Sequence, residues 1–333
     1  MPILGNMRLH LPNSAFLGNL DPFLRNLVLS EPEKMEITAN KRWLSLHPVV
    51  LCIIAALGLR TTKIHCERLE AKSKHYLERM GVFRMLHISS GINIQEHEPA
   101  GRFVPLSQIK NSPQLNSFMN EIVPLLHLAP SEAEPIKYVI GELVRNVFEH
   151  AASESGALVC AQYYKKSNSI KIGIADVGIG IRKTINQSHF AATDLDAIRL
   201  ALTPGVTGTT SREGGTEYNA GAGLFFIKSL AKLHRNFFLV YSGSAMYKLL
   251  KESPGKHPIL YSDPFKDRHS AANDYPVWKG TVIGIDLSLD TSLEFSSFLG
   301  LAGKALVKAI KERKKEKYRP KVKFICLQLN FAP

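Results

Sequence analysis

The sequence predicts a mixed α/β (α+β) fold, because apolar runs typical of strands alternate with segments of helical periodicity along most of the chain. With 333 residues, 45% of them apolar, the chain can form a sizeable core and about two domains. We therefore expect a smaller α/β module at residues 35–100 and a larger α/β domain at 113–290. Residues 1–34 are expected to form a separate N-terminal segment, and residues 291–333 a basic C-terminal helix or tail.

Short units alternate in the smaller module. An extended run begins at Met35, an apolar helix is expected at 48–59, a strand-like segment at 63–70 and a helical segment at 72–86. The apolar run at 48–59 is shorter than the roughly 20 residues that a membrane-spanning helix needs. We therefore expect a buried core helix there, within a small α/β module that has right-handed crossovers.

The larger domain begins with two expected helices. The first follows Ser112 and ends near Leu128, and the second is opened by a capping box of Ser131 and Glu134 and ends near Ala152. After them we expect two strands at 157–164 and 169–176, then a helix at 195–202 and a long loop at 203–222. A further helix begins at 223, and two more strands are expected at 237–242 and 281–289. The loop is long and rich in Gly and Thr, and we interpret it as a lid over a functional site.

Charge and cysteine content limit the classes of protein. The net charge is +13, and residues 304–323 alone hold ten Lys or Arg against two Glu. Such a tail either meets phosphates or an acidic partner, or is simply a solvated helix face, which we favour. The four cysteines lie far apart without a CxxC pair, which argues against a zinc site and a disulfide framework. With no secretory signal visible either, we expect a cytoplasmic protein without membrane association.

A polar stripe lies on the second helix of the larger domain. Glu142, Asn146 and His150 recur every four residues beside an apolar stripe, so they share the edge of the buried face. An amide oxygen is a hard ligand for Mg²⁺, and a carboxylate one turn away can align or deprotonate an attacking water. This E-x-x-x-N pattern is weak on its own, since a solvent-exposed helix face has the same spacing.

Two further motifs flank apolar strands. Asp176 directly follows the strand at 169–175, where its carboxylate can accept a hydrogen bond from an exocyclic amine, and Gly178 and Gly180 allow the backbone to approach a flat base. By itself this D-x-G-x-G motif is equally typical of a tight turn. At Gly280 and Thr281 the threonine hydroxyl could bond a base or a bound water, although the pair alone indicates little.

The fourth motif opens the helix that begins near residue 223. Asn219, Gly221, Gly223 and Leu224 belong to it, and glycines at a helix start leave backbone N–H groups free to bind phosphate oxygens. A single GxG is usually structural. Arg212 is the one basic side chain of the preceding loop and is our candidate for a phosphate contact, although a solvated loop arginine is about as plausible.

The order and spacing of these motifs resemble the GHKL ATPase fold, which gyrase, the heat-shock chaperone family, histidine kinases and MutL share. The resemblance spans 113–290 and implies a two-layer α/β sandwich of the histidine-kinase-like ATPase type that binds ATP and Mg²⁺. It implies that Glu142 is the general base, that Asn146 is the Mg²⁺ ligand and that Asp176 binds the amine of adenine. It also implies that Gly178 and Gly180 border the base, that Gly221 and Gly223 bind phosphates and that Thr281 completes the adenine pocket. Further candidates for nucleotide binding are His150, Asn219 and Leu224 of the same motifs and Arg212 of the loop.

Details of the motifs favour one branch of this group. The helix ends with the pattern N-x-x-x-H-A, and Phe225 stands where many histidine kinases have a glycine, so the chain looks closer to anti-sigma-factor serine kinases. A phospho-acceptor histidine is not evident, because His65 lies in a strand-like stretch. Residues 35–100 weakly resemble a STAS domain, but Ser45 lacks the usual acceptor setting, so we favour a structural module that docks on the larger domain.

Three functions stay open at this point. We favour an enzyme, an ATPase or serine/threonine protein kinase that hydrolyses ATP or transfers its γ-phosphate in intracellular signalling. The second is a non-catalytic, ATP-gated interaction switch, and for both a protein partner is expected, STAS-like or another regulator. The third is an ATP-driven protein that binds nucleic acid through the basic residues 304–323.

Overall fold

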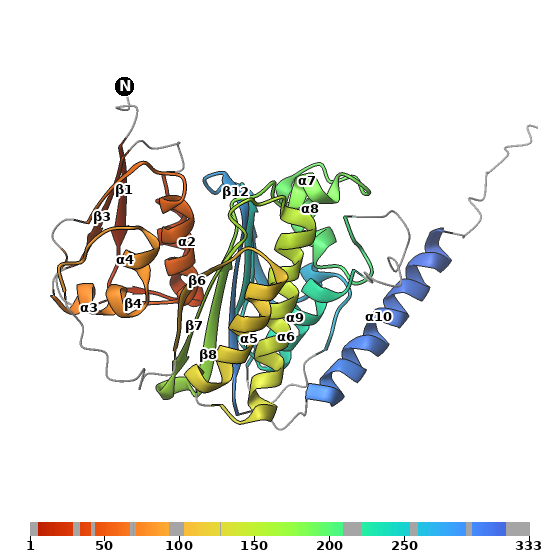
Figure 1. Ribbon diagram of the computed structural model, residues 1–333. Coiled ribbons are helices and arrows are strands. Elements are labelled where there is room, and N and C mark those ends of the chain that lie inside the picture. The colour runs from red at the N-terminus through yellow and green to blue at the C-terminus, as the bar shows by residue number, and fades with distance from the viewer. Residues whose placement is uncertain are drawn as a thin grey trace, which may run out of the picture.

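The computed structural model describes residues 6–28, 34–40, 44–66, 69, 71–92, 103–126, 128–208, 221–253, 259–290 and 295–317. These residues form a mixed α/β structure with a small parallel sheet, a large antiparallel sheet and helices on both faces of the large sheet (Figure 1). No helix within these ranges is long and apolar enough to span a membrane.

The small sheet has three parallel strands in the order β1-β3-β5: Asn6–Leu11, Lys34–Ala39 and Lys63–Cys66. The same part of the chain contains two short strands, β2 (Ser14–Ala15) and β4 (Ser45–Leu46), and a 3₁₀ helix, η1 (Leu17–Asn19). Its α-helices are α1 (Asp21–Arg25), α2 (Pro48–Gly58), α3 (Ala71–Arg79) and α4 (Val82–Met85). The segment before residue 35 is therefore not separate. It supplies strand β1, whose buried Met7, Leu9 and Leu11 alternate with exposed Arg8 and His10.

The large sheet has seven antiparallel strands in the order β11-β10-β9-β12-β8-β7-β6. Their bounds are β6 Phe103–Ile109, β7 Ala157–Tyr164, β8 Ser169–Ala175, β9 Phe238–Gly243, β10 Ala245–Leu249, β11 His269–Ala272 and β12 Trp278–Ser288. The sheet thus begins with β6, ten residues before the expected domain start at 113. The central strands are buried on both faces, which explains their nearly continuous apolar sequence.

One face of the large sheet is covered by the helices α5 (Ser112–Leu126), α6 (Pro130–Asn146) and α9 (Gly223–Leu233), as Figure 1 shows. The shorter α7 (Ile181–Ile185) and α8 (Asp194–Ala201) lie at one end of this layer. Helix α10 (Phe295–Lys317) contacts α6 and α9 near its start, through Phe295 and Phe298. Two short 3₁₀ turns, η3 (Lys165–Ser167) and η4 (Pro264–Lys266), lie in loops of the large sheet.

The expected capping box of Ser131 and Glu134 is wrong. Helix α6 begins at Pro130, with Ala129 and not Ser131 at its N-cap, and the carboxylate of Glu132 accepts a hydrogen bond from the backbone N–H of Ala129 at 2.9 Å. A proline at the first helical position has the φ angle that a helix requires and no N–H that would stay unpaired, so the sequence favours the earlier start. At its other end, α6 continues into a π-helical turn, η2, at Val147–Ala151.

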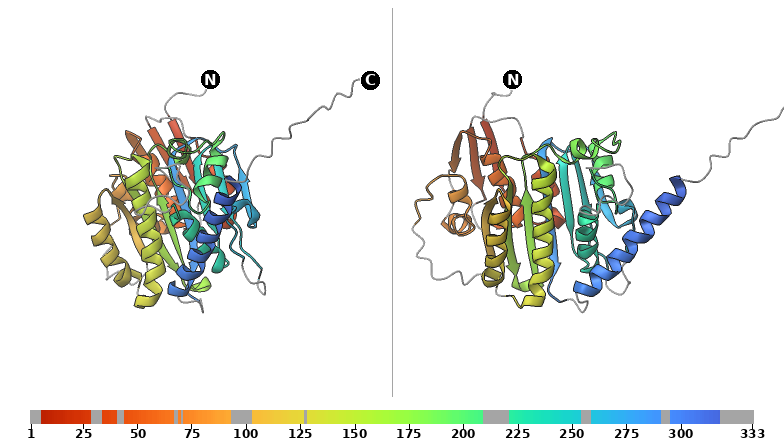
Figure 2. Two further views of the ribbon diagram at one scale, coloured as in Figure 1. Left: turned by 90° about the vertical axis from the view of Figure 1, so that its right-hand side faces the viewer. Right: turned by 45° about the vertical axis from the view of Figure 1, so that its right-hand side comes forward.

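Helix α2 covers the opposite face of the large sheet and forms a layer between the two sheets (Figures 1 and 2). Its side chains from Val49 to Ala56 are completely buried. Gly173 of β8 allows this close approach, and Gly284, its partner on β12, lies against the side chains of Leu17 and His47. A Cβ on Gly173 would lie 2.2 Å from the backbone nitrogen of Val49. The module therefore docks on the large sheet through direct backbone contact.

Buried polar contacts also join the module to the large sheet. His47 Nε2 lies 3.0 Å from Asp286 Oδ1, and Lys171 Nζ lies 2.7 Å from the other oxygen of Asp286. Burial alone would raise the pKa of Asp286, but His47 and Lys171 hold it below its ordinary value. Farther along the sheet, the guanidinium of Arg25 forms a two-pronged ion pair with Asp274 at 3.0 and 3.1 Å.

Candidate functional site

A cavity of about 330 Å³ lies between α6, α9 and the ends of β8 and β12. Its apolar wall includes Ile174, Ile181, Ile185, Val206 and Ile283. The residues predicted from the sequence that line it are Glu142, Asn146, His150, Asp176, Gly180, Gly221, Gly223, Leu224 and Thr281. Arg212 and Asn219 lie outside the described residues. The four motifs, which are far apart in the sequence, therefore meet at one cavity with an apolar side and a polar side.

Asp176 is held at the inner end of the cavity, directly after β8. Its side chain is almost completely buried, and Oδ1 accepts a hydrogen bond from the backbone N–H of Gly178 at 2.8 Å. Its backbone N–H donates to the carbonyl of Thr281 at 2.9 Å, which fixes β8 against β12. Burial raises the pKa of the Asp176 carboxyl to about 6, although its hydrogen bonds with Gly178 and Thr281 lower it. A group in this position is well suited to accept a hydrogen bond from a bound molecule.

The glycines after Asp176 are required by close packing. Gly178 does not line the cavity but lies against the π-helical turn, where an added Cβ would be 2.0 Å from the carbonyl oxygen of Ala151. Gly180 has a φ of +77° and lies against Ser242, whose buried hydroxyl donates to Gly280 O at 2.7 Å and accepts from the backbone N–H of Ile181 at 3.0 Å. The loop is therefore held rigidly between α6 and the sheet.

Glu142 and Asn146 lie one turn apart on α6 and face the start of α9. A Cβ on Gly223 would be 2.8 Å from Glu142 Oε2 and 4.0 Å from Asn146 Nδ2. Only a residue without a side chain leaves room for this approach. Gly221 has a φ of +60° and accepts a hydrogen bond from Gly205 N–H at 2.8 Å, so it turns the chain into the helix. The first backbone N–H groups of α9 thus lie beside a carboxylate and an amide.

The carboxylate of Glu142 has a partner that the sequence did not indicate. Arg145 Nη2 donates to Glu142 Oε1, from a guanidinium that is about half exposed at the rim of the cavity. Tyr138, one turn before Glu142, also lines the cavity, and its phenol pKa is raised by burial and by the Glu142 carboxylate. A charge pair three residues apart on a helix is common on solvated surfaces, which is why sequence alone does not single out Arg145.

His150 lies in the π-helical turn at the edge of the cavity. Its carbonyl accepts a hydrogen bond from the hydroxyl of Thr184 at 3.0 Å, and its ring is 3.7 Å from a carboxylate oxygen of Glu149. Burial lowers the pKa of the His150 ring, although Glu149 raises it. The extra residue of the π turn brings this segment against α7, and such turns are frequent at functional sites.

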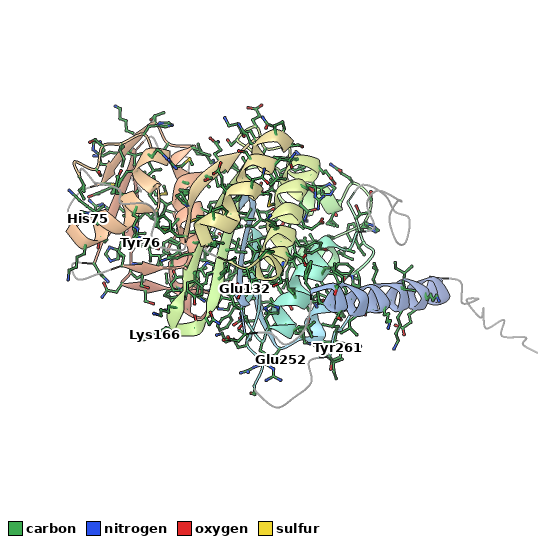
Figure 3. The ribbon with its side chains drawn as sticks, turned by 60° about the horizontal axis from the view of Figure 1, so that its bottom comes forward. His75, Tyr76, Glu132, Lys166, Glu252 and Tyr261 are labelled. Carbon is green, nitrogen blue, oxygen red and sulfur yellow. The ribbon has the colours of Figure 1, made fainter. Side chains whose placement is uncertain are left out.

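Behind the cavity, the second half of α9 is fixed by buried ion pairs. Lys228 and Lys232 both bind the buried carboxylate of Asp267. Lys232 also lies 3.4 Å from Glu252 and 4.5 Å from the centre of the ring of Tyr261, and both of these residues are labelled in Figure 3. These contacts hold the helix whose N-terminus faces Glu142, so they set the geometry of the site without lining it.

The described residues form a mixed α/β protein with a cavity at the N-terminus of helix α9. No protein-family model matches the chain, and no curated protein matches it. Among the residues that the structure describes, no group of three or more His, Cys, Asp or Glu side chains could hold a metal ion.

Proposed function

We propose that the cavity binds ATP together with Mg²⁺ and that the protein hydrolyses ATP or transfers its γ-phosphate. The larger domain would then be a two-layer sandwich of the histidine-kinase-like ATPase type, closest to the anti-sigma-factor serine kinases. The observation that carries the proposal is the convergence of four sequence motifs on one cavity, which brings Glu142, Asp176, Gly223 and Thr281 together.

The inner end of the cavity supports adenine as the base. A buried carboxylate, Asp176, lies next to the apolar residues Ile174 and Ile283, so a flat ring can stack while its exocyclic amine donates to Asp176. A volume of about 330 Å³ is within the range of small-molecule sites, about 300 to 1,000 Å³. Guanine carries a carbonyl oxygen at the corresponding position and would face the carboxylate with an acceptor, so ATP should bind more tightly than GTP.

The other end of the cavity supports phosphates. The N-terminus of α9 offers free backbone N–H groups and the positive end of the helix dipole. Asn146 would supply an oxygen ligand to Mg²⁺, and Glu142 would accept a proton from the attacking water or hydroxyl group. Because its Oε2 faces the α9 N-terminus, Glu142 is next to the place where the terminal phosphate would lie.

Calorimetry with ATP and GTP, with and without Mg²⁺, tests the binding part of the proposal. We expect Mg²⁺-dependent ATP binding and weaker GTP binding. Incubation with γ-labelled ATP and candidate protein acceptors then tests turnover, by showing whether label appears in free phosphate, in this chain or in a partner. Absence of ATP binding would overturn the proposal, and binding without any transfer of label would favour the non-catalytic switch.

Two variants separate binding from chemistry at this site. Glu142→Ala should keep ATP affinity but lower turnover by about 10² to 10⁴, the usual contribution of a general base. Asn146→Ala should weaken Mg²⁺-dependent binding, because the ion loses its protein ligand and must take a water instead. Equal turnover in the Glu142 variant and the parent would show that Glu142 is not the base.

A further inference from the structure

We infer that Arg145 is a positioning residue for Glu142, an inference that rests on the proposed function. The two carboxylate oxygens of Glu142 have different surroundings. Oε1 accepts a hydrogen bond from Arg145 Nη2, whereas Oε2 is the atom that faces Gly223 at the start of α9. The ion pair thus fixes the plane of the carboxylate and directs one oxygen toward the reacting end of the nucleotide.

The need for such a restraint follows from the surroundings of Glu142. Its side chain is about one quarter exposed, and a glutamate at a cavity rim has several accessible rotamers. Gly223 approaches Oε2 closely but carries no side chain that could fix the plane of the carboxylate. A guanidinium on the next turn of the same helix moves with α6 and can select one rotamer.

Arg145 reaches Glu142 from the rim of the cavity, which its side chain also lines. Its guanidinium lies about 4.0 Å from the position of a Cβ on Gly141, which is close to the helix surface, and its side chain is 55% exposed. Because its partner is the Glu142 carboxylate, we assign it to orienting that carboxylate rather than to binding the nucleotide. Replacing it should change the rate of the reaction through Glu142 and change ATP affinity little.

The variant Arg145→Gln removes the charge and keeps most of the side-chain length. We expect an ATP dissociation constant within about threefold of the parent and a hydrolysis or transfer rate that is about 10 to 100-fold lower, as for other small misplacements of a reacting group. Arg145→Lys keeps a cation and should recover part of the rate. Arg199→Gln is a matched control, because Arg199 is also about half exposed and pairs with a carboxylate, Asp263, outside the cavity.

A double-mutant cycle with Glu142→Gln distinguishes positioning from a general structural effect. If Arg145 acts through Glu142, then Arg145→Gln causes no further loss of rate in the Glu142→Gln background. Additive losses, an unchanged rate or a faster rate in the single variant, or a loss confined to ATP affinity would each overturn the inference. If the parent binds no ATP or shows no turnover, the proposed catalytic function fails first and the inference fails with it.

Discussion

Replacement of Asp176 by asparagine should make the protein more stable and a poorer ATP binder. The carboxyl is almost completely buried, and burial raises its pKa from 3.8 to about 6. This shift of about 2 units corresponds to about 3 kcal/mol of unfavourable ionisation in the folded state at neutral pH. Asparagine carries no charge and keeps an oxygen that can accept the Gly178 N–H, so up to about 3 kcal/mol of stability should be gained.

The pH dependence has a defined direction. The folded-state pKa of Asp176 is higher than the unfolded-state value, so the destabilisation is complete above about pH 6 and disappears as the pH falls from 6 toward 3.8. The stability advantage of Asp176→Asn should therefore be largest at pH 7 and clearly smaller at pH 5. Urea unfolding of both proteins at the two pH values measures it.

Binding should change in the opposite direction. The asparagine amide can present a donor to the adenine amine, and the loss of a charge-assisted hydrogen bond costs roughly 1.5 to 3 kcal/mol, which is about tenfold or more in affinity. In the parent, ATP affinity should also fall as the pH is lowered through about 6, and this dependence should be absent in the variant. A variant that is less stable at pH 7, or that binds ATP like the parent, would refute this account of Asp176.

Three further substitutions test the packing around the site and between the sheets. Gly173→Ala should cost about 3 kcal/mol or more in urea unfolding, because the new methyl group would meet the backbone of Val49; a cost below 1 kcal/mol would contradict this contact. Asp286→Ala should cost about 3 to 5 kcal/mol, since buried Lys171 loses its counter-charge and the Nε2–H of His47 loses its acceptor, and a neutral effect would mean that water replaces the carboxylate. Gly223→Ala should displace the Glu142 carboxylate and lower turnover by about 10 to 100-fold, whereas parental turnover would show that the carboxylate adjusts freely.

The sequence predicted the central strands and their end residues well. Strand β7 occupies the expected residues 157–164, and β8 ends one residue before Asp176, because both strands are buried runs joined by a short polar turn. The ends of such strands can be predicted because the sequence changes there from apolar to polar residues. The four sequence motifs could be placed for the same reason, since each is attached to the end of a recognisable strand or helix.

Features that depend on distant parts of the chain could not be predicted. Strands β10 and β11 were missed. Strand β11 is only four residues long, and its sequence, HSAA, has no strand periodicity. Gly173 looks like a poor strand residue until α2 is seen lying against it. Arg145 resembles any helix-surface cation, and only the orientation of the Glu142 carboxylate distinguishes it.

The burial of α2 between the two sheets has a consequence for how the chain folds. A helix whose side chains from Val49 to Ala56 are all buried has no face that water can solvate, so it gains stability only when both sheets are in place. The small sheet and the large sheet should therefore unfold in a single cooperative transition, although their strands form separate sheets. A fragment that ends at residue 100, or one that begins at residue 103, would each expose an apolar surface that is buried in the whole chain. Both fragments should therefore aggregate.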